Sequence, residues 1–260
     1  MIVVANQKGG VGKSTTSVNL AIGLAQAGQR TLLVDMDPQG NASFALLGSK
    51  ELASTTYDLL VNEYGASDVI IPTQHSLLSL IPTDINLAGA EVELQTQPGG
   101  WTKLQERFED TSVLAGFDYV VIDTPPSLGL LTINALAAAD EIIIPVSASI
   151  FALKGIEQLE KTIARVQKSL KRPDLRIGGI LCTMADHTNV ARDVLSAIQK
   201  RFGSLVFTTV IPKNIKLEEA HSRATSVYEY APESRGAEAY AAFVDEVLAQ
   251  AEEVVIHGRR

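Results

Sequence analysis

The sequence predicts an α/β fold in which a mostly parallel, twisted sheet carries helices on both faces. Apolar runs bounded by turn residues recur along the chain, and the segments between them mostly have helical periodicity. Strands that alternate with helices form a parallel sheet covered on both faces. With 260 residues, 46% of them apolar, the chain is long enough for one large domain over 1–260. The runs expected to be strands lie at 2–5, 31–34, 77–81, 119–122, 142–146, 177–182 and 205–211.

Three helical segments are expected from the pattern between these strands. The first helix spans about 13–27 and stops at Gly28. Between about 84 and 118 lies a less apolar helical insertion, interrupted by Pro98-Gly99-Gly100. The last segment, 238–253, reads as an amphipathic helix whose inward residues are Tyr240, Phe243, Val247 and Leu248.

Residues 8–15, with the sequence K-G-G-V-G-K-S-T, follow the first strand and predict a phosphate-binding loop (P-loop). In such loops the backbone N–H groups surround the phosphates, a lysine reaches the β and γ oxygens, and the next hydroxyl binds Mg²⁺. Lys13 and Ser14 have this spacing. The usual pattern has glycine at Gln7, and this chain instead has a second cation, Lys8, so the loop is a deviant one. The residues expected to contact a bound nucleoside triphosphate are Gly9, Gly10, Val11, Gly12, Lys13, Ser14 and Thr15.

Carboxylates close two further buried-strand patterns. Asp35 and Asp37 follow one apolar run, and Asp123 follows another. Ligands of open α/β sheets lie beyond the carboxyl ends of the strands, so these acids are expected to converge with Lys13. Asp123 is expected to hold Mg²⁺ through a water, the usual role of an acid after the second P-loop strand. These motifs argue against the alternative, a glycine-rich turn without a ligand.

Composition excludes several classes of protein. The single cysteine, Cys182, rules out a disulfide framework and a cluster of thiolate metal ligands, and a buried, inert thiol is expected there. A net charge of −8 argues against a surface adapted throughout to nucleic acid. Residues 1–150 hold 6 Lys/Arg and 16 Asp/Glu, whereas 151–260 hold 16 and 14. Any DNA contact is therefore expected in the second half.

The chain resembles the ParA/Soj-type partition ATPases, members of the deviant Walker group that also contains MinD. The resemblance runs nearly end to end. The motifs that carry it are K-G-G-V-G-K-S-T at 8–15, V-D-M-D-P-Q-G-N at 34–41, I-D-T-P-P-S-L-G at 122–129, V-I-P-K-N at 210–214 and S-R-G-A-E-A-Y at 234–240.

This resemblance implies roles for charged residues of the loop and the strand ends. Lys8 would reach across a homodimer to the phosphates of the other subunit, so that ATP is sandwiched at the interface. Its cation would act there as an arginine finger does. Asp37 would position or polarise the attacking water. Asp35 would support the metal shell together with Ser14 and Asp123, with a helix-capping acid as the structural alternative.

The resemblance also implies nucleotide-base and DNA contacts. Met184 and Pro212 would flank the adenine, with Asn214 near its edge, although a methionine there is often part of the core. Sequence-independent contacts to DNA phosphates would come from Lys213, Lys216 and Arg223.

Three departures from the family pattern stand out. Expected cations are missing at His187 and Thr225, for which Arg192, Lys200 and Arg201 would compensate. A solvated polar face is the alternative for each of these cations. The third departure is at Ser147 to Phe151, where the family often has a Gln-Cys-Glu-Phe-Tyr-like run, and the sequence does not say which contact it alters.

The expected function is a positioning ATPase in the cytoplasm. Its ATP-bound dimer would sit on nucleoid DNA until a ParB-like or other cargo adaptor stimulates hydrolysis. The chain begins directly on the first strand, so no N-terminal operator-binding domain and no repressor role are expected.

Three alternatives remain. A MinD-like membrane-associated ATPase ends in a basic anchor, whereas Asp245, Glu246, Glu252 and Glu253 would repel anionic lipid. An iron–sulfur relative needs more than one cysteine. A non-enzymatic, nucleotide-gated scaffold would lack the roles implied for Asp37 and Lys8.

Overall fold

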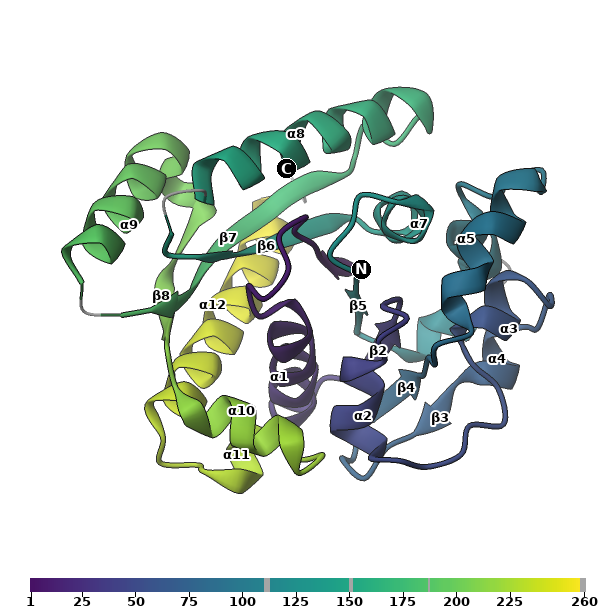
Figure 1. The fold of residues 1–260 in the computed structure, drawn as a ribbon, viewed down its shortest axis with the longest axis horizontal. Coiled ribbons are helices and arrows are strands. Elements are labelled where there is room, and N and C mark those ends of the chain that lie inside the picture. The colour runs from purple at the N-terminus through teal and green to yellow at the C-terminus, as the bar shows by residue number, and fades with distance from the viewer. Residues whose placement is uncertain (110–112, 150–151, 187, 258–260) are drawn as a thin grey trace.

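The structure, a computed structural model, describes residues 1–109, 113–149, 152–186 and 188–257, with side chains as far as Glu253. In this part of the chain one sheet has eight strands in the order β3-β4-β2-β5-β1-β6-β7-β8 (Figure 1). Every neighbouring pair is parallel except β3 and β4. The predicted fold class is confirmed. The strands are β1 Ile2–Val4, β2 Thr31–Asp35, β3 Ile71–Pro72, β4 Leu78–Ile81, β5 Tyr119–Asp123, β6 Glu141–Ser147, β7 Arg176–Ala185 and β8 Val206–Pro212.

Each of the seven predicted strands is present, and β3 is an addition. Its two residues, one of them proline, are too few to show the alternation that marks a strand. The expected first helix is α1, Lys13–Gln26, and Gly28 beyond it has a φ of 86°. The insertion expected between about 84 and 118 contains α5, α6 and the 3₁₀ turn η1.

The helices mostly follow the strands in turn. Their bounds are α1 Lys13–Gln26, α2 Asn41–Leu47, α3 Thr56–Leu60, α4 Ala66–Val69, α5 Leu87–Thr96, α6 Lys103–Glu109, α7 Leu130–Ala138, α8 Ala152–Ser169, α9 Asn189–Phe202, α10 Ile215–Ser222, α11 Val227–Tyr230 and α12 Arg235–His257, with η1 Leu114–Gly116 and η2 Gly203–Leu205. Among the described helices none is long and apolar enough to cross a bilayer.

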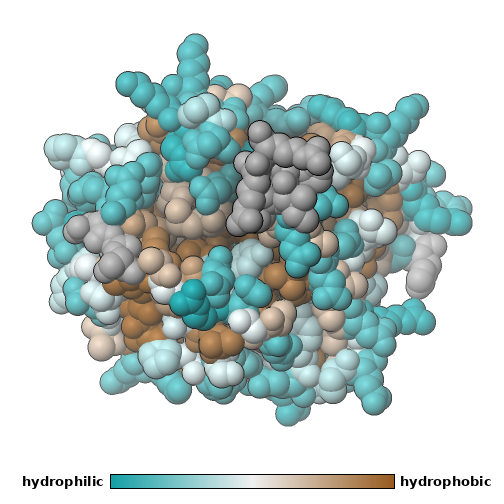
Figure 2. Space-filling view, turned by 180° about the vertical axis from the view of Figure 1, so that it is seen from behind, coloured by the Kyte–Doolittle hydropathy of each residue, from teal (hydrophilic) through white to brown (hydrophobic). Residues whose placement is uncertain are grey.

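The sheet separates two hydrophobic cores. Consecutive strand residues point to opposite faces, so Val3 belongs to one core and its neighbours Ile2 and Val4 to the other. α5, α7 and α8 cover the first face, and α1 and α12 cover the second (Figure 1). Seen from behind, polar side chains dominate the rim of the molecule and apolar ones show in a hollow toward its middle (Figure 2).

Strand register brings the ends of three strands together. β1 lies between β5 and β6, with Val4 opposite Asp123 on one side and Ile143 on the other. In the pairing of β2 with β5, Asp35 lies opposite Asp123. The loops that leave β1, β2 and β5 therefore start side by side at one edge of the sheet, where the sequence motifs predict the site.

Candidate functional site

The loop between β1 and α1 has the backbone geometry of an anion cradle. Gly10 and Gly12 have φ angles of 68° and 81°, a left-handed conformation that favours glycine. No side chain caps the first turn of α1, so its N–H groups are left for a ligand. The Thr183 hydroxyl donates to the carbonyl of Val11 at 2.9 Å and ties the loop to β7.

Lys13 lies among carboxylates at the base of this loop. Its side chain is buried, with the residue 6% exposed. Burial lowers the pKa of Lys13, and the charges of Asp123 and Asp37 oppose this change. The Ser17 hydroxyl donates to Asp123 Oδ1 at 2.8 Å. The expected convergence of the strand-end acids with Lys13 is present, and the assignment of roles to them remains a prediction.

Asp123 also has an unsatisfied oxygen. Its Oδ2 is buried and has no hydrogen-bond partner among the described residues. Burial raises the pKa of this carboxyl, whereas the hydroxyls of Ser14 and Ser17 favour its ionised form. A cation or a cation-bound water facing Oδ2 would satisfy the atom and offset its desolvation. The residues present therefore fit a Mg²⁺ ion near Ser14.

A metal here cannot rely on a cage of protein ligands. In the described part of the chain no three His, Cys, Asp or Glu side chains gather as ligands. Mg²⁺ in phosphate sites takes most of its ligands from phosphates and waters, with one or two from the protein. One hydroxyl and a water-linked carboxylate are therefore a sufficient protein contribution.

Both carboxylate oxygens of Asp35 accept hydrogen bonds from neighbouring residues. Its Oδ2 accepts from the backbone N–H and the hydroxyl of Ser43 at 2.8 and 2.7 Å, and its Oδ1 accepts from the N–H of Asp37 at 3.1 Å. Because Ser43 lies in the first turn of α2, these contacts are those of the helix-capping alternative. Burial and the charge of Asp123 raise the pKa of Asp35. Its place in the metal shell stays a prediction.

Asp37 is less constrained. It is buried, and its Oδ1 accepts from the N–H of Gln39 at 3.0 Å. With Lys13, Gln39 and Asn41 it lines a cavity of about 330 Å³ above the loop. This placement lets a carboxylate contact a water beside a bound phosphate.

A second cavity, of about 220 Å³, adjoins the first and has Gly12, Thr15, Met184 and His221 in common with it. Pro212 and Asn214 line its far side. Met184 is 41% exposed, and its φ of 51° is rare for a residue with a side chain. This methionine is therefore not part of the core. Contact with adenine stays a prediction for Met184, Pro212 and Asn214.

Two features of this cavity lay beyond the sequence reasoning. Asn214 is the N-cap of α10, and its Oδ1 accepts from the N–H of Lys216 at 2.9 Å. The NH₂ group of the Asn214 side chain is the part that can still contact a ligand. His221, which the sequence analysis did not single out, lines both cavities, and burial lowers its pKa. The residue lies in the last turn of α10, and no motif marks it.

Lys8 lies outside the cradle that holds Lys13. Its side chain is exposed, and its Nζ donates to the hydroxyls of Ser147 and Ser149 at 3.1 and 2.9 Å. The contact thus crosses from the P-loop to the segment after β6. The two lysines of one loop occupy different environments.

The cations proposed for DNA differ in their surroundings. Lys216 pairs with Glu219 at 2.8 Å, and both Lys216 and Arg223 lie over the ring of Tyr230. Lys213 is exposed beside the second cavity. Within the described ranges Lys213 forms no ion pair.

The compensating cations lie on α9. Arg192 is in its first turn and donates to Asn189, and Lys200 lies about 12 Å further along the helix axis. Arg201 pairs with Glu157 and Glu160 of α8. Of the two sites with missing cations, Thr225 donates its hydroxyl to Glu229 at 2.9 Å. His187 lies outside the described residues.

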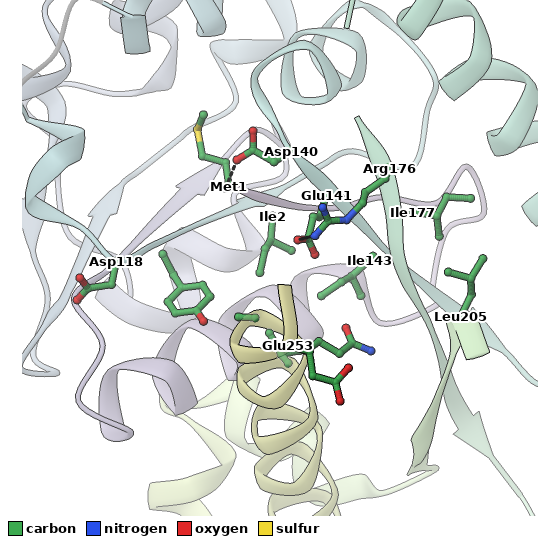
Figure 3. Close-up of a pocket in the computed structure, with 15 residues that line it drawn as sticks. Met1, Ile2, Asp118, Asp140, Glu141, Ile143, Arg176, Ile177, Leu205 and Glu253 are labelled. Carbon is green, nitrogen blue, oxygen red and sulfur yellow. Dashed lines mark hydrogen bonds and ion pairs between the residues drawn. The ribbon is translucent and has the colours of Figure 1, made fainter. Parts of the chain in front are cut away.

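A further cavity, of about 520 Å³, lies elsewhere (Figure 3). It lies where the strands begin, next to α12, and ion pairs join the Met1 amino group to Asp140 and Arg176 to Glu141. The phosphate loop is at the opposite edge of the sheet. Although this cavity is larger than the two beside the loop, it is therefore not the site that the sequence motifs predict.

The comparisons with known proteins agree with this geometry. Residues 1–177 match the family model of an AAA domain, and 109–258 match that of the 4Fe-4S iron sulfur cluster binding proteins of the NifH/frxC family. The sporulation initiation inhibitor protein Soj of Bacillus subtilis is 46% identical over 96% of this chain and 98% of its own. The chromosome partitioning protein ParA of Myxococcus xanthus is 42% identical over 95% and 87%.

Solved structures share the fold. Cobyrinic acid a,c-diamide synthase from Mycobacterium smegmatis, with bound ATP analog and magnesium, has a TM-score of 0.82 at 35% identity and covers 96% of this chain and 95% of its own. The septum site-determining protein MinD from Pyrococcus horikoshii, complexed with Mg-ADP, is more distant, with a TM-score of 0.73 at 25% identity over 95% and 94%. A 4Fe–4S cluster needs cysteine thiolates, and this chain has one cysteine. That thiol, Cys182, is buried, and burial raises its pKa to about 11.

Proposed function

The chain belongs to the Soj/ParA family of chromosome-partitioning ATPases, and from this membership we propose that it hydrolyses ATP as a homodimer bound to non-specific DNA. A ParB-like or other cargo adaptor stimulates the hydrolysis, and the protein works as a single domain in the cytoplasm, associated with the nucleoid. The MinD-like alternative is less well supported, because the last helix carries acidic residues.

The observation that best supports this proposal is that two lysines of one loop lie in different environments. Lys13 is buried beside Asp37 and Asp123, where it can neutralise phosphate oxygens of the nucleotide in its own subunit. Lys8 is exposed, and among the described residues its ammonium contacts two neutral hydroxyls, so its cation is available to a second subunit. This arrangement favours an ATP site completed by dimerisation.

In the proposed binding step the cradle residues hold the triphosphate. The N–H groups of Gly10, Gly12 and the first turn of α1 face its oxygens, and the Lys13 ammonium provides charge in a buried setting. Ser14 directly and Asp123 through a water would hold Mg²⁺, which neutralises charge on the phosphates. Met184, Pro212 and Asn214 surround the base.

In the proposed hydrolytic step the acid and the second lysine act on opposite sides of the reacting phosphate. The Asp37 carboxylate orients a water for in-line attack and accepts its hydrogen bond. Lys8 of the other subunit stabilises the charge that grows on the leaving oxygens. The DNA contacts of Lys213, Lys216, Arg223, Arg192 and Lys200 double on dimerisation, which couples DNA binding to ATP.

The test is an Asp37→Ala variant assayed on two unrelated DNA duplexes with ATP, with ADP and without nucleotide. We expect it to bind ATP, dimerise and stay on both duplexes equally, while turnover falls to background. The native chain should bind DNA with ATP and release it as ADP forms. Equal DNA binding in all three nucleotide states would contradict the proposal, as would normal turnover by the variant.

A further inference from the structure

The exposed lysine of the loop has a defined resting place in the single subunit. Its Nζ donates to Ser147 Oγ at 3.1 Å and to Ser149 Oγ at 2.9 Å, and the two hydroxyls are 3.4 Å apart. Ser147 is the last residue of β6, and Ser149 follows in the next loop. Two neutral oxygens therefore converge on one ammonium.

The backbone around this contact is anchored independently. β1 pairs with β6, and the Asn6 side chain donates to the carbonyl of Pro145 at 2.7 Å. The same side chain accepts from the N–H of Lys8 at 3.0 Å. The base of Lys8 is therefore fixed against β6, and only its side chain is free to change partner.

The chemistry of the partners makes the contact a weak one. In the part of the chain that the structure describes, Lys8 forms no ion pair with a carboxylate. Hydroxyls hold an exposed ammonium less strongly than a carboxylate or phosphate does, because no opposite charge is involved.

We propose that Ser147 and Ser149 are positioning residues that hold Lys8 in the single subunit and release it to the other subunit's ATP phosphates. This proposal rests on the proposed function, in which Lys8 acts across the dimer. The resting contact competes with the contact across the interface. The two serines therefore set the protein concentration at which the ATP dimer forms and turnover begins.

The experiment measures the dimer dissociation constant with ATP in an Asp37→Ala background, by analytical ultracentrifugation. Ser147→Ala with Ser149→Ala removes the competing contact, and we expect tighter dimerisation by about twofold, below the upper limit for an exposed ion pair because the hydroxyls carry no charge. Ser149→Glu adds a carboxylate to the resting place and should weaken dimerisation by a similar factor. If the two serines only supported the local structure, the alanine and glutamate variants would not change the dimer dissociation constant in opposite directions.

Lys8→Gln provides the double-mutant control, because it removes the group on which the serines act. In that background the serine substitutions should leave the dissociation constant unchanged. Ser67→Ala, at an exposed serine of α4, is the matched control for a hydroxyl lost elsewhere. Melting temperatures show whether each variant folds.

The outcomes separate the two proposals. If the Asp37→Ala protein does not dimerise with ATP, the proposed function fails. If it dimerises but the serine variants shift nothing, or shift the constant equally in the Lys8→Gln background, the proposal about Ser147 and Ser149 is overturned.

Discussion

The phosphate-loop site and the candidate DNA face use the same kinds of charged residue in different ways. At the loop, Lys13 is buried between strand ends, and the register of β1, β2 and β5 determines which carboxylates it meets. On the DNA face, Lys213 and Lys216 are at the surface, and Lys216 is already paired with Glu219. The fold therefore determines the partners of a buried charge. The affinity of an exposed charge for DNA depends instead on whether a neighbouring carboxylate already pairs with it.

The largest expected effect tests the buried side of this comparison. Lys13→Ala should weaken ATP binding by about 100-fold or more, which is about 2.7 kcal/mol, because it removes a desolvated cation from the phosphates. Isothermal titration calorimetry on the single subunit measures it. Lys8→Ala is the matched control and should retain ATP affinity there, because Lys8 lies outside the cradle. Undiminished affinity in Lys13→Ala would remove the basis for the site.

Charge reversal on the exposed side should have a smaller effect. Lys213→Glu combined with Lys216→Glu should weaken ATP-dependent DNA binding by about 30-fold at low salt, and should flatten its salt dependence because fewer counterions are released. A surface-binding assay over a series of salt concentrations measures both. Lys168→Glu with Lys171→Glu changes the same charge in the last turn of α8 and just beyond it, and should have little effect. If that pair weakens binding equally, the DNA face lies elsewhere.

The carboxylate that caps α2 should matter for stability. Ser43 donates its hydroxyl to Asp35 at 2.7 Å and accepts from the N–H of Thr83 at 2.9 Å, so Ser43→Ala removes one of the two bonds to Asp35 Oδ2 and leaves the buried Thr83 N–H without its partner. We expect the free energy of unfolding to fall by about 1–2 kcal/mol in urea. Ser67→Ala should change it by less than about 0.5 kcal/mol. An unchanged midpoint in Ser43→Ala would show that Asp35 does not depend on this contact.

The smallest expected effect compares two neighbouring lysines. Lys213→Ala should weaken DNA binding by about threefold, since each lost phosphate contact reduces the salt-dependent affinity modestly. Lys216→Ala should have a weaker effect, because Glu219 already offsets its ammonium. The same surface-binding assay decides. If Lys216→Ala weakens DNA binding as much as Lys213→Ala or more, the ion pair with Glu219 does not reduce the contribution of Lys216 to DNA binding.

Much of the fold and part of the site could be predicted from local sequence. The seven longer strands could be recognised because each is an apolar run bounded by turn residues. β3 was missed because its two residues are too few to show the alternation of a strand. Lys13 and Ser14 stand out by their spacing within one loop. The left-handed backbone conformation of Met184 and its exposure could not be derived from the local pattern, since apolar residues at strand ends usually belong to the core. His221 carries no motif, and only the packing of α10 beside the loop brings it to the cavity.

By itself the sequence determined the features whose partners are near in the chain. These are the order of strands and helices, the glycines of the loop, and the placing of carboxylates directly after strands. Each follows from backbone geometry over a few residues, where the period of a strand or helix decides which side chains share a face.

Only the tertiary structure decided which distant side chains meet. The hydrogen bond from Ser17 to Asp123 spans 106 positions, and that from Lys8 to Ser149 spans 141. Such pairs depend on the order and register of parallel strands, and those depend on the packing of whole helices against both faces of the sheet. The same reason explains why Lys8 rests on two serines far along the chain, whereas the contact of Asp35 with Ser43 spans only 8 positions, from the end of β2 to the start of α2.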